Sequence, residues 1–268
     1  MYDYFQETQQ MSTDAQNNLD PSSDAQVDFG YRTVALSQKQ NLVNDVFDSV
    51  ASSYDIMNDL MSIGVHRLWK EALLDWMAPR PNQILADLAG GTGDVSLKFL
   101  QRGGQFAHVI DINEQMLAAG QKRRVVNKYQ DRLNWLAGDA QAIPLAENSV
   151  DRVTIAFGLR NVPERMKALN QIIRILKPGG RFCCLEFSHV KNPLLSGVYD
   201  RWSFNVLPKL GQLVAGDAQS YQYLVESIRQ FPSQAELCTM MADAGMVQIK
   251  VRNLSGGIAA IHSGWKLD

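Results

Sequence analysis

The chain has 268 residues, of which 46% are hydrophobic and 20% charged, and its formal net charge at pH 7 is −2. This length suits one large α/β domain or at most two small ones. No apolar run reaches about 18 residues, so no transmembrane helix is expected. The N-terminus lacks a basic start, an apolar stretch and any arginine before Arg32, which argues against a signal peptide or a mitochondrial presequence.

Charge is unevenly distributed along the chain. Residues 1–31 hold six acidic residues and no basic one, so the remainder has a modest basic excess. Such an excess permits contact with an anionic membrane surface but does not indicate a nucleic-acid groove. The three cysteines, Cys183, Cys184 and Cys238, lack the number and spacing of a disulfide framework or a metal site. They are consistent with a reducing, cytoplasmic location.

The expected elements begin after a polar N-terminal segment. The composition of residues 1–30 predicts a disordered acidic tail. Ordered structure is expected from near Ser37, where helical spacing of apolar residues begins, and a second helix is expected over 66–77. From residue 83 short apolar strands alternate with helices, which predicts a parallel sheet covered on both faces. The expected strands are 83–88, 106–111, 133–137, 150–156 and 181–187, and the expected helices are 94–102, 114–127 and 163–176.

Residues 192–232 interrupt this alternation and are expected to form a helical insert on the substrate side. Its apolar residues, which include Tyr199 and Trp202, suit either the lid of an apolar groove or a plain cap over the core. A helix over 233–244 and strands over about 246–252 and 257–265 complete a seven-stranded, doubly wound sheet. Residues 31–268 are therefore expected to form a single domain.

The first predicted strand runs into a glycine-rich turn, which reads Asp87-Leu-Ala-Gly-Gly-Thr-Gly-Asp94. Gly90, Gly91 and Gly93 let the backbone turn tightly and approach a ligand, although many such turns are plain strand–helix connections. The pattern departs from the G-x-G-x-x-G of dinucleotide-binding folds. Carboxylates at both ends of the turn would repel a pyrophosphate but suit a ligand that bears an amino group and a sulfonium. The turn therefore favours S-adenosylmethionine over NAD.

Two further carboxylates follow the next two predicted strands. Asp111 lies 18 positions after Gly93, close to the spacing at which a carboxylate accepts hydrogen bonds from ribose hydroxyls in doubly wound folds. Its alternative role, capping the next helix, is served better by Asn113. Asp139 is placed to accept a hydrogen bond from an adenine amino group, or to act only as a turn carboxylate. Both residues are predicted to bind the cofactor.

Two segments are too particular for generic helix or loop, namely residues 54–66, YDIMNDLMSIGVH, and residues 174–188, RILKPGGRFCCLEFS. Together they resemble the signature segments of the UbiE/COQ5/MenG family of ubiquinone/menaquinone biosynthesis C-methyltransferases, and residues 157–161, FGLRN, are similar to that family's too. The resemblance covers about residues 32–268. It implies a class I S-adenosylmethionine-dependent methyltransferase fold with a Rossmann-like sheet. It also implies methyl transfer to a ring carbon of a polyprenylated benzoquinol or naphthoquinol.

The resemblance also carries over individual contacts. The implied cofactor contacts are Thr92, Asp111, Asp139 and Ala140. A further contact position, serine in some members, is Ala156 here, so a hydroxyl contact is lost. The partner that the resemblance implies is a polyprenylated quinol, and other enzymes of quinone biosynthesis and a second copy in a homodimer are further candidates. Basic neighbours of the apolar residues in the 192–232 insert can meet lipid headgroups, so peripheral contact with a membrane surface is expected. Two alternatives stay open: methylation of another lipid or phenolic molecule, and a non-catalytic cofactor-binding scaffold.

The chemistry of ring methylation suggests further site residues. A neutral aromatic carbon is a poor nucleophile, and ionising a phenol of pKa about 10 costs about 4 kcal/mol at pH 7, which a cation in a dry site can offset. Arg160 is the candidate cation and Asn161 the candidate for orienting the ring oxygen. Their alternative roles are a surface arginine and a helix cap. Tyr54, Asp55 and His66 are candidate site-lining residues, although a lone histidine is more often structural.

Overall fold

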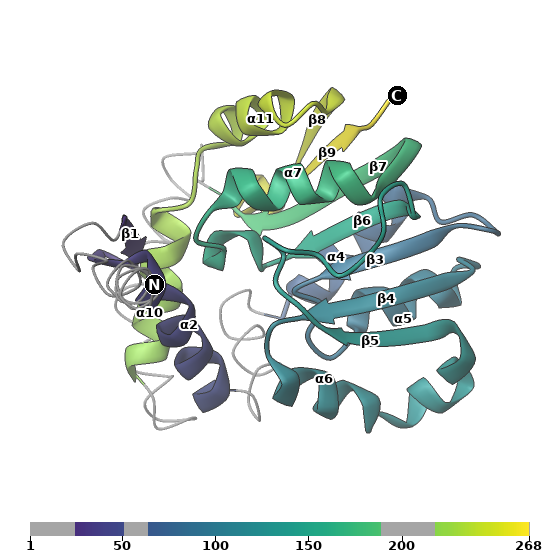
Figure 1. Ribbon diagram of the computed structural model, residues 1–268, viewed down its shortest axis with the longest axis horizontal. Helices are drawn as coiled ribbons and strands as arrows, with labels where there is room; N and C mark the ends of the chain where they lie inside the picture. Colours follow the sequence, from purple (N-terminus) through teal and green to yellow (C-terminus); the bar gives the residue numbers. More distant parts are fainter. Residues whose placement is uncertain (1–24, 51–63, 189–217, 268) are drawn as a thin grey trace, which may run out of the picture.

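The computed structural model describes residues 25–50, 64–188 and 218–267. Within these ranges the chain forms a seven-stranded sheet with helices on both faces (Figure 1). Four of the predicted site-lining residues, Tyr54, Asp55, Tyr199 and Trp202, lie outside the described residues. Most of the predicted insert, residues 192–232, also lies outside the described residues. Its last part is described and contains the helix α10 (Ala218–Arg229).

The sheet confirms the predicted strands. In spatial order the strands are β5 (Leu133–Ala137), β4 (Phe106–Asp111), β3 (Ile84–Leu88), β6 (Val150–Ala156), β7 (Leu176–Phe187), β9 (Ala259–Trp265) and β8 (Val247–Leu254). The first five run parallel, and β9 pairs antiparallel with both β7 and β8.

Two hydrophobic cores lie on opposite faces of this sheet. Side chains of a strand alternate between faces, so Leu85 and Cys183 belong to one core and the neighbouring Ala86 and Cys184 to the other. The first core is covered by α4 (His66–Met77), α5 (Asp94–Gln101) and α6 (Glu114–Gln121). The second is covered by α7 (Arg165–Ile175) and α11 (Gln234–Asp243). Both faces are therefore buried, as the near-continuous apolar strands predict.

Ordered structure begins earlier than the sequence predicts. Strands β1 (Gln26–Phe29) and β2 (Arg32–Ala35) form a hairpin, and α2 (Leu36–Val50) follows directly. The hairpin packs on α10: the Phe29 ring stacks on Tyr223 with centroids 4.2 Å apart. Composition predicted disorder through residue 30 and order from near Ser37, and this start is wrong because α10 supplies the apolar partner that the short hairpin lacks by itself.

Two element boundaries also differ from expectation. Strand β7 begins at Leu176, which pairs with Val150, whereas Arg181 pairs with Arg152. Residues 177–180, KPGG, are therefore bulged out of the ladder rather than preceding the strand. The helix expected over 114–127 ends at Gln121, and 3-10 turns follow at Arg124–Lys128 and Gln130–Arg132.

The order of the strands determines where a ligand can bind. From β3 the chain proceeds outward through β4 to β5 and then returns to place β6 on the other side of β3. Loops that leave the carboxyl ends of β3 and β6 therefore diverge, and a crevice opens at this switch point. Helices α2 and α10 and the β1–β2 hairpin lie opposite these strand ends (Figure 1). The site is thus expected between the sheet edge and this group of elements.

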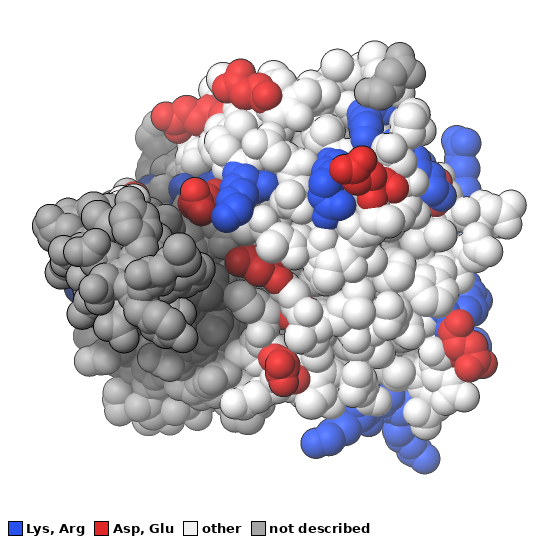
Figure 2. Space-filling model, in the orientation of Figure 1, with Lys and Arg blue, Asp and Glu red and all other residues white. Residues whose placement is uncertain are grey.

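The described helices and the face of the molecule drawn in Figure 2 can be checked for membrane-spanning length and for a basic patch. Among the described residues no helix combines the length and apolar character needed to cross a bilayer. On the face drawn in Figure 2, side chains of both charges are scattered among uncharged ones. That face therefore lacks the broad basic patch typical of nucleic-acid binding.

Candidate functional site

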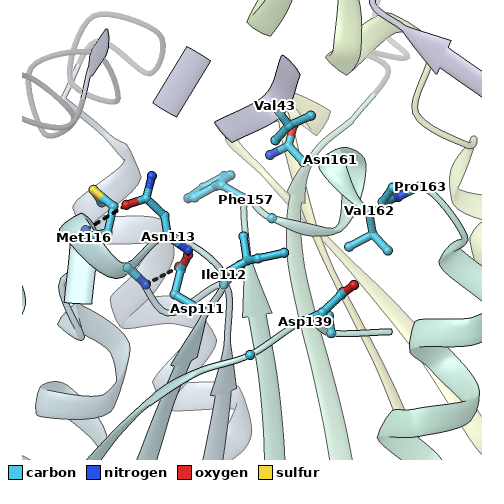
Figure 3. A pocket seen from close by; sticks show the side chains of 15 residues that line it. Val43, Asp111, Ile112, Asn113, Met116, Asp139, Phe157, Asn161, Val162 and Pro163 are labelled. Atoms are coloured by element: carbon cyan, nitrogen blue, oxygen red, sulfur yellow. Dashed lines mark hydrogen bonds between the residues drawn. The ribbon is translucent and has the colours of Figure 1, made fainter. Parts of the chain in front are cut away.

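A recess of about 710 Å³ opens at the carboxyl ends of the central strands. Asp111 and Asn113 line one side and Asp139 the opposite side, while Phe157 and Asn161 lie between them at the far end (Figure 3). Helix α2 contributes one apolar side chain. The complete lining is Val43, Ala89, Gly91, Asp111, Ile112, Asn113, Met116, Gly138, Asp139, Ala140, Phe157, Gly158, Asn161, Val162 and Pro163. We call this the larger recess.

A smaller recess of about 400 Å³ adjoins it beneath the glycine-rich turn. The two recesses share Ala89, Gly91 and Phe157, so a ligand can extend from one into the other. The remaining lining residues of the smaller recess are Lys70, Asp87, Gly90, Thr92, Asp94, Val95 and Ala156. Every predicted cofactor residue except Gly93 therefore lines one recess or the other.

Asp87 is buried at the end of β3, with 1% of its surface exposed. Its carboxylate accepts hydrogen bonds from the Ser96 amide at 3.2 Å, the Ser96 hydroxyl at 2.9 Å and the Thr154 hydroxyl at 2.7 Å. Burial raises the pKa of Asp87 to about 6, although these hydrogen bonds and the nearby Lys70 act in the opposite direction. The residue therefore ties β3 to α5 and β6 at the floor of the smaller recess.

Three residues of the glycine-rich turn have left-handed φ values, namely Ala89 and two glycines. Gly91 has φ +53° and Gly93 has φ +74°, values that favour glycine. Gly93 precedes α5, and a Cβ there would come within 2.7 Å of the Trp135 ring. Gly93 lines neither recess, so its role is to let the helix start close to β5. Gly91 lines both recesses and places its backbone against any ligand that spans them.

Asp111 holds the turn from the β4 side. Its carboxylate accepts hydrogen bonds from the Gly91 amide at 2.8 Å and the Asn113 amide at 2.9 Å. Burial raises the pKa of Asp111, partly offset by backbone donors that include these two. Asn113 accepts from the Met116 amide at 3.0 Å and so caps α6, which confirms the sequence expectation for that residue (Figure 3). The carboxylate of Asp111 still lines the larger recess.

Asp139 faces Asp111 across the larger recess. It accepts hydrogen bonds from the Gln141 amide at 2.8 Å and from the Gln141 side chain at 2.9 Å. The turn role weighed for Asp139 is therefore present, and the residue also lines the recess beside Ala140. The two roles are compatible because a carboxylate offers about four acceptor positions.

The charges of the larger recess discriminate between nucleotide classes. Its fifteen lining residues include two carboxylates and neither lysine nor arginine. A pyrophosphate would meet no cation among them and would be repelled by Asp111 and Asp139. A nucleoside without phosphates has hydroxyls and an amino group that can donate to these carboxylates. The residues present therefore fit S-adenosylmethionine and do not fit NAD.

The smaller recess contains one cation that the sequence did not single out. Lys70 extends from α4, and its ammonium group lies 3.1 Å from Asp94 Oδ2 at the start of α5. Burial tends to raise the pKa of Asp94, but Lys70 and the more distant Lys98 and Arg123 lower it below its ordinary value. The recess thus presents an ammonium group beside the carboxylates of Asp87 and Asp94.

Arg160 is buried rather than exposed, with 2% of its surface accessible, so its alternative role as a surface arginine is wrong. Its guanidinium pairs with Glu186 at 3.0 Å and donates to the Phe157 carbonyl at 2.6 Å. Nε and Nη2 have no hydrogen-bond partner among the described residues. Arg160 lines neither recess, so the described geometry places it behind the wall and not in contact with an acceptor.

Asn161 does reach the larger recess. The sequence also suggested it as the cap of the following helix, and this alternative is wrong because Glu164 occupies the N-cap position of α7. Its Oδ1 instead accepts a hydrogen bond from the Tyr223 hydroxyl at 3.1 Å. The structure therefore separates the predicted catalytic pair: Asn161 faces the recess and Arg160 supports the wall.

His66 is the one predicted substrate-lining residue that the structure describes. It is the first residue of α4, as expected, and has 2% of its surface exposed. It lines neither recess. The described geometry thus agrees with the structural role that the sequence also allowed.

Several lining residues were not predicted. Val43, Met116 and Lys70 lie on helices, where their spacing indicates only an amphipathic face. Phe157 is different, because its backbone adopts φ +59°, an uncommon value for a bulky side chain. Strain of this kind clusters at functional sites. The FGLRN segment carried the only sequence signal, and that signal pointed to Arg160 and Asn161 rather than to the phenylalanine.

Comparison with known proteins agrees with this geometry. The sequence pattern of the ubiE/COQ5 methyltransferase family matches residues 33–266. Ubiquinone/menaquinone biosynthesis C-methyltransferase UbiE of Roseobacter denitrificans is 55% identical over 240 residues, which cover 89% of this chain and 96% of that protein. The protein of the same name from Paracoccus denitrificans is 54% identical over 250 residues, which cover 93% and 100%.

Solved structures with the same fold are more distant in sequence. A SAM-dependent methyltransferase from Aquifex aeolicus aligns with a TM-score of 0.52 and 18% identity, covering 73% of this chain and 88% of that one. The [4+2]-cyclase SpnF aligns with a TM-score of 0.61 and 14% identity, covering 84% and 95%. One of these two proteins is titled a methyltransferase and the other a cyclase. The structural similarity therefore establishes the fold alone.

The buried carboxyl of Asp87 gives a pH dependence of stability. The folded protein binds this proton more tightly than the unfolded chain, because the pKa rises from 3.8 to about 6. The contribution of this proton to the free energy of unfolding is therefore complete below pH 3.8 and is lost as pH rises through about 6. Relative to Asp87→Asn, the free energy of unfolding of the ligand-free protein should fall by about 1–3 kcal/mol across this interval. Urea unfolding of both proteins measures it, and a pH-independent difference would contradict the assignment.

Proposed function

The chain belongs to the ubiE/COQ5 methyltransferase family, and from that premise we propose that it transfers the methyl group of S-adenosylmethionine to a ring carbon of a polyprenylated quinol in ubiquinone or menaquinone biosynthesis. The observation that carries the proposal is the pair of joined recesses at the switch point. The carboxylates of the larger recess suit a nucleoside without phosphates. Phe157, which lines both recesses, lies near the side-chain amide of Asn161.

The two recesses suit the two ends of the methyl donor. We propose that Asp111 accepts hydrogen bonds from the ribose hydroxyls and that Asp139, beside Ala140, accepts one from the adenine amino group. The amino-acid end extends into the smaller recess, past Gly90, Gly91, Thr92 and Ala156. There the ammonium group of Lys70 pairs with the carboxylate of the ligand. Asp87 and Asp94 balance the positive charges of the ligand's amino group and sulfonium. When bound, S-adenosylmethionine supplies an electrophilic methyl group on a sulfonium.

The acceptor ring is placed at the apolar end of the larger recess. Val43, Phe157 and Val162 line this end with apolar side chains. An apolar environment strengthens any hydrogen bond to an ionised ring oxygen. Asn161 is the described polar side chain that can make such a bond at this end. The remaining task of the protein is to hold the ring carbon in line with the methyl group and the sulfur.

Arg160 supports this wall from behind. Its guanidinium holds the Phe157 carbonyl, and its own backbone amide donates to Glu186 Oε1 at 3.2 Å. These bonds fix the short 3-10 turn Leu159–Asn161 on which Asn161 lies. We therefore propose that Arg160 acts by positioning Phe157 and Asn161, and that its charge, largely offset by Glu186, is secondary.

The expected partners other than the quinol extend the proposal. A polyprenylated acceptor partitions into lipid, so we propose that the protein contacts a membrane surface peripherally, and that it associates as a homodimer and with other quinone-biosynthesis enzymes. Co-sedimentation with anionic vesicles tests the first association, and sedimentation velocity of the purified chain tests the second.

Methyl transfer from labelled S-adenosylmethionine tests the proposed function. Demethylated benzoquinol and naphthoquinol analogues should both be assayed under reducing conditions, with the oxidised quinones as matched controls. We expect label in a reduced ring and none in the quinones, because only a quinol offers an ionisable hydroxyl. Cofactor binding without transfer to either quinol would contradict the proposal and favour another phenolic acceptor or a scaffold.

Lys70→Met tests the placement of the amino-acid end. A hydrogen bond to a charged group contributes about 1.5–3 kcal/mol, so affinity for S-adenosylmethionine should fall by about 10- to 100-fold. Affinity for 5′-methylthioadenosine, which lacks the amino-acid carboxylate, should be unchanged. Calorimetric titration measures both. Equal losses for the two ligands would mean that Lys70 only braces Asp94 and does not contact the ligand.

Arg160→Gln tests the support of the wall. Turnover should fall by about tenfold or more, since misplacing a positioning group by about 1 Å can cost a hundredfold. Affinity for S-adenosylmethionine should be retained because Arg160 lines neither recess. Arg181→Gln is the matched control, because it removes another buried arginine, one that bonds Trp76 and Ser263 instead. Unchanged turnover in Arg160→Gln would refute the assigned role.

A further inference from the structure

One polar contact at the larger recess comes from outside the Rossmann-like core. Tyr223 lies on α10, and its hydroxyl donates to Asn161 Oδ1 at 3.1 Å. Both side chains are buried, with 5% and 9% of their surfaces exposed. Asn161 lines the recess and Tyr223 does not. The tyrosine therefore reaches the recess only through the amide of Asn161.

The hydrogen bond and the charges around this contact favour one orientation of the amide. The positive charges of Arg160 and Arg165 act on the Tyr223 hydroxyl, and the negative charge of Glu186, which pairs with Arg160, opposes them more weakly. The remaining positive field favours the carbonyl oxygen of Asn161 over its amino group on the Tyr223 side. Nδ2 makes no hydrogen bond with the described residues, and Asn161 lines the recess. The amide thus presents an N–H donor, and not an acceptor, to a bound ring.

The Tyr223 hydroxyl is a dependable donor. Burial raises the pKa of Tyr223 to about 12, although Arg160 and Arg165 act to lower it. The hydroxyl is consequently protonated at neutral pH. A second contact restricts the ring, since Phe29 of the β1–β2 hairpin stacks on it at 4.2 Å with an interplanar angle of 21°. The hairpin is itself anchored to α10 by the Tyr31 amide, which donates to Glu226 at 3.0 Å.

We propose that Tyr223 is a positioning residue that locks the Asn161 amide, so that Asn161 Nδ2 donates a hydrogen bond to the ring oxygen of the acceptor. The inference rests on the proposed function and specifies how the acceptor oxygen is recognised. An N–H donor in a dry recess stabilises the oxyanion more than the neutral hydroxyl. Because the amide is already oriented, it does not have to turn when the ring hydroxyl ionises. The bond to Tyr223 also disfavours the flipped amide, in which Oδ1 would face the oxyanion.

The structural alternative is that the contact merely joins α10 to the 3-10 turn. The two roles differ in what removal of the hydroxyl changes. A purely structural bond affects stability and leaves the ionisation of a bound phenol unaltered. A lock on the amide changes that ionisation even where the fold is intact.

The first test compares Tyr223→Phe with Tyr221→Phe. Tyr221 is a matched control because it is a buried tyrosine of the same helix that neither lines the recess nor bonds Asn161. We expect Tyr223→Phe to lower kcat with the quinol by about 10- to 100-fold, with unchanged affinity for S-adenosylmethionine. Tyr221→Phe should keep kcat within about twofold of the wild type. Equal effects of the two variants would overturn the proposal.

The second test does not require turnover. A nitrophenol bound beside S-adenosylhomocysteine reports its ionisation through its absorption band. The pKa of the bound phenol should lie below its value in water in the wild type and in Tyr221→Phe, and should return toward it in Tyr223→Phe. An identical value in all three proteins would refute the lock. If the wild type methylates no quinol, the proposed function fails, whereas this measurement still decides the role of Tyr223.

Asn161→Asp provides a variant that leaves Tyr223 intact. The substitution keeps an acceptor for the tyrosine and removes the N–H donor at nearly constant shape. We expect kcat at or below that of Tyr223→Phe, with no further loss in the double variant because both changes remove one interaction. Wild-type turnover in Asn161→Asp would show that no donor is needed at this position.

Discussion

The buried carboxylate of Asp87 is the interaction on which both recesses depend. It accepts hydrogen bonds from Ser96, in the first turn of α5, and from Thr154 on β6. These bonds fix the strand that precedes the glycine-rich turn, the helix that follows it and the neighbouring strand across the switch point. Burying a carboxylate is costly unless its lone pairs are satisfied. The three donors therefore maintain a geometry that apolar packing alone would not specify.

Charge is distributed unevenly around the site in a way that suits its proposed ligands. The larger recess is lined by two carboxylates, two side-chain amides and apolar groups, whereas Arg160 lies behind its wall and is paired with Glu186. Lys70 is the cation of the smaller recess. This separation directs the amino-acid end of a sulfonium ligand to one side and leaves an apolar end for a ring. The fold alone does not fix this outcome, because a [4+2]-cyclase shares it.

Most of the sheet and the cofactor wall could be predicted because their signals are local. Strand–helix alternation located β3 to β6 closely, and the AGGTGD turn and the aspartates after the strands located the recess. The remaining residues depend on contacts between distant segments. Glu186 pairs with Arg160 across 26 positions, and Tyr223 meets Asn161 across 62. No periodicity encodes such pairs. The β1–β2 hairpin was missed because its stability comes from α10 and not from its own polar composition.

We propose that the methyl group is received by a ring carbon that is held near Asn161 and in line with the donor. The most direct measurement is to locate the transferred methyl by NMR, using S-adenosylmethionine carrying a ¹³C-methyl group and a demethylated quinol with free ring hydroxyls. We expect an aryl-methyl resonance, with the hydroxyls unmodified. A methoxy resonance would contradict methylation of the ring carbon, because it would show that the ring oxygen itself attacks the methyl group and is therefore not the atom held by the Asn161 amide.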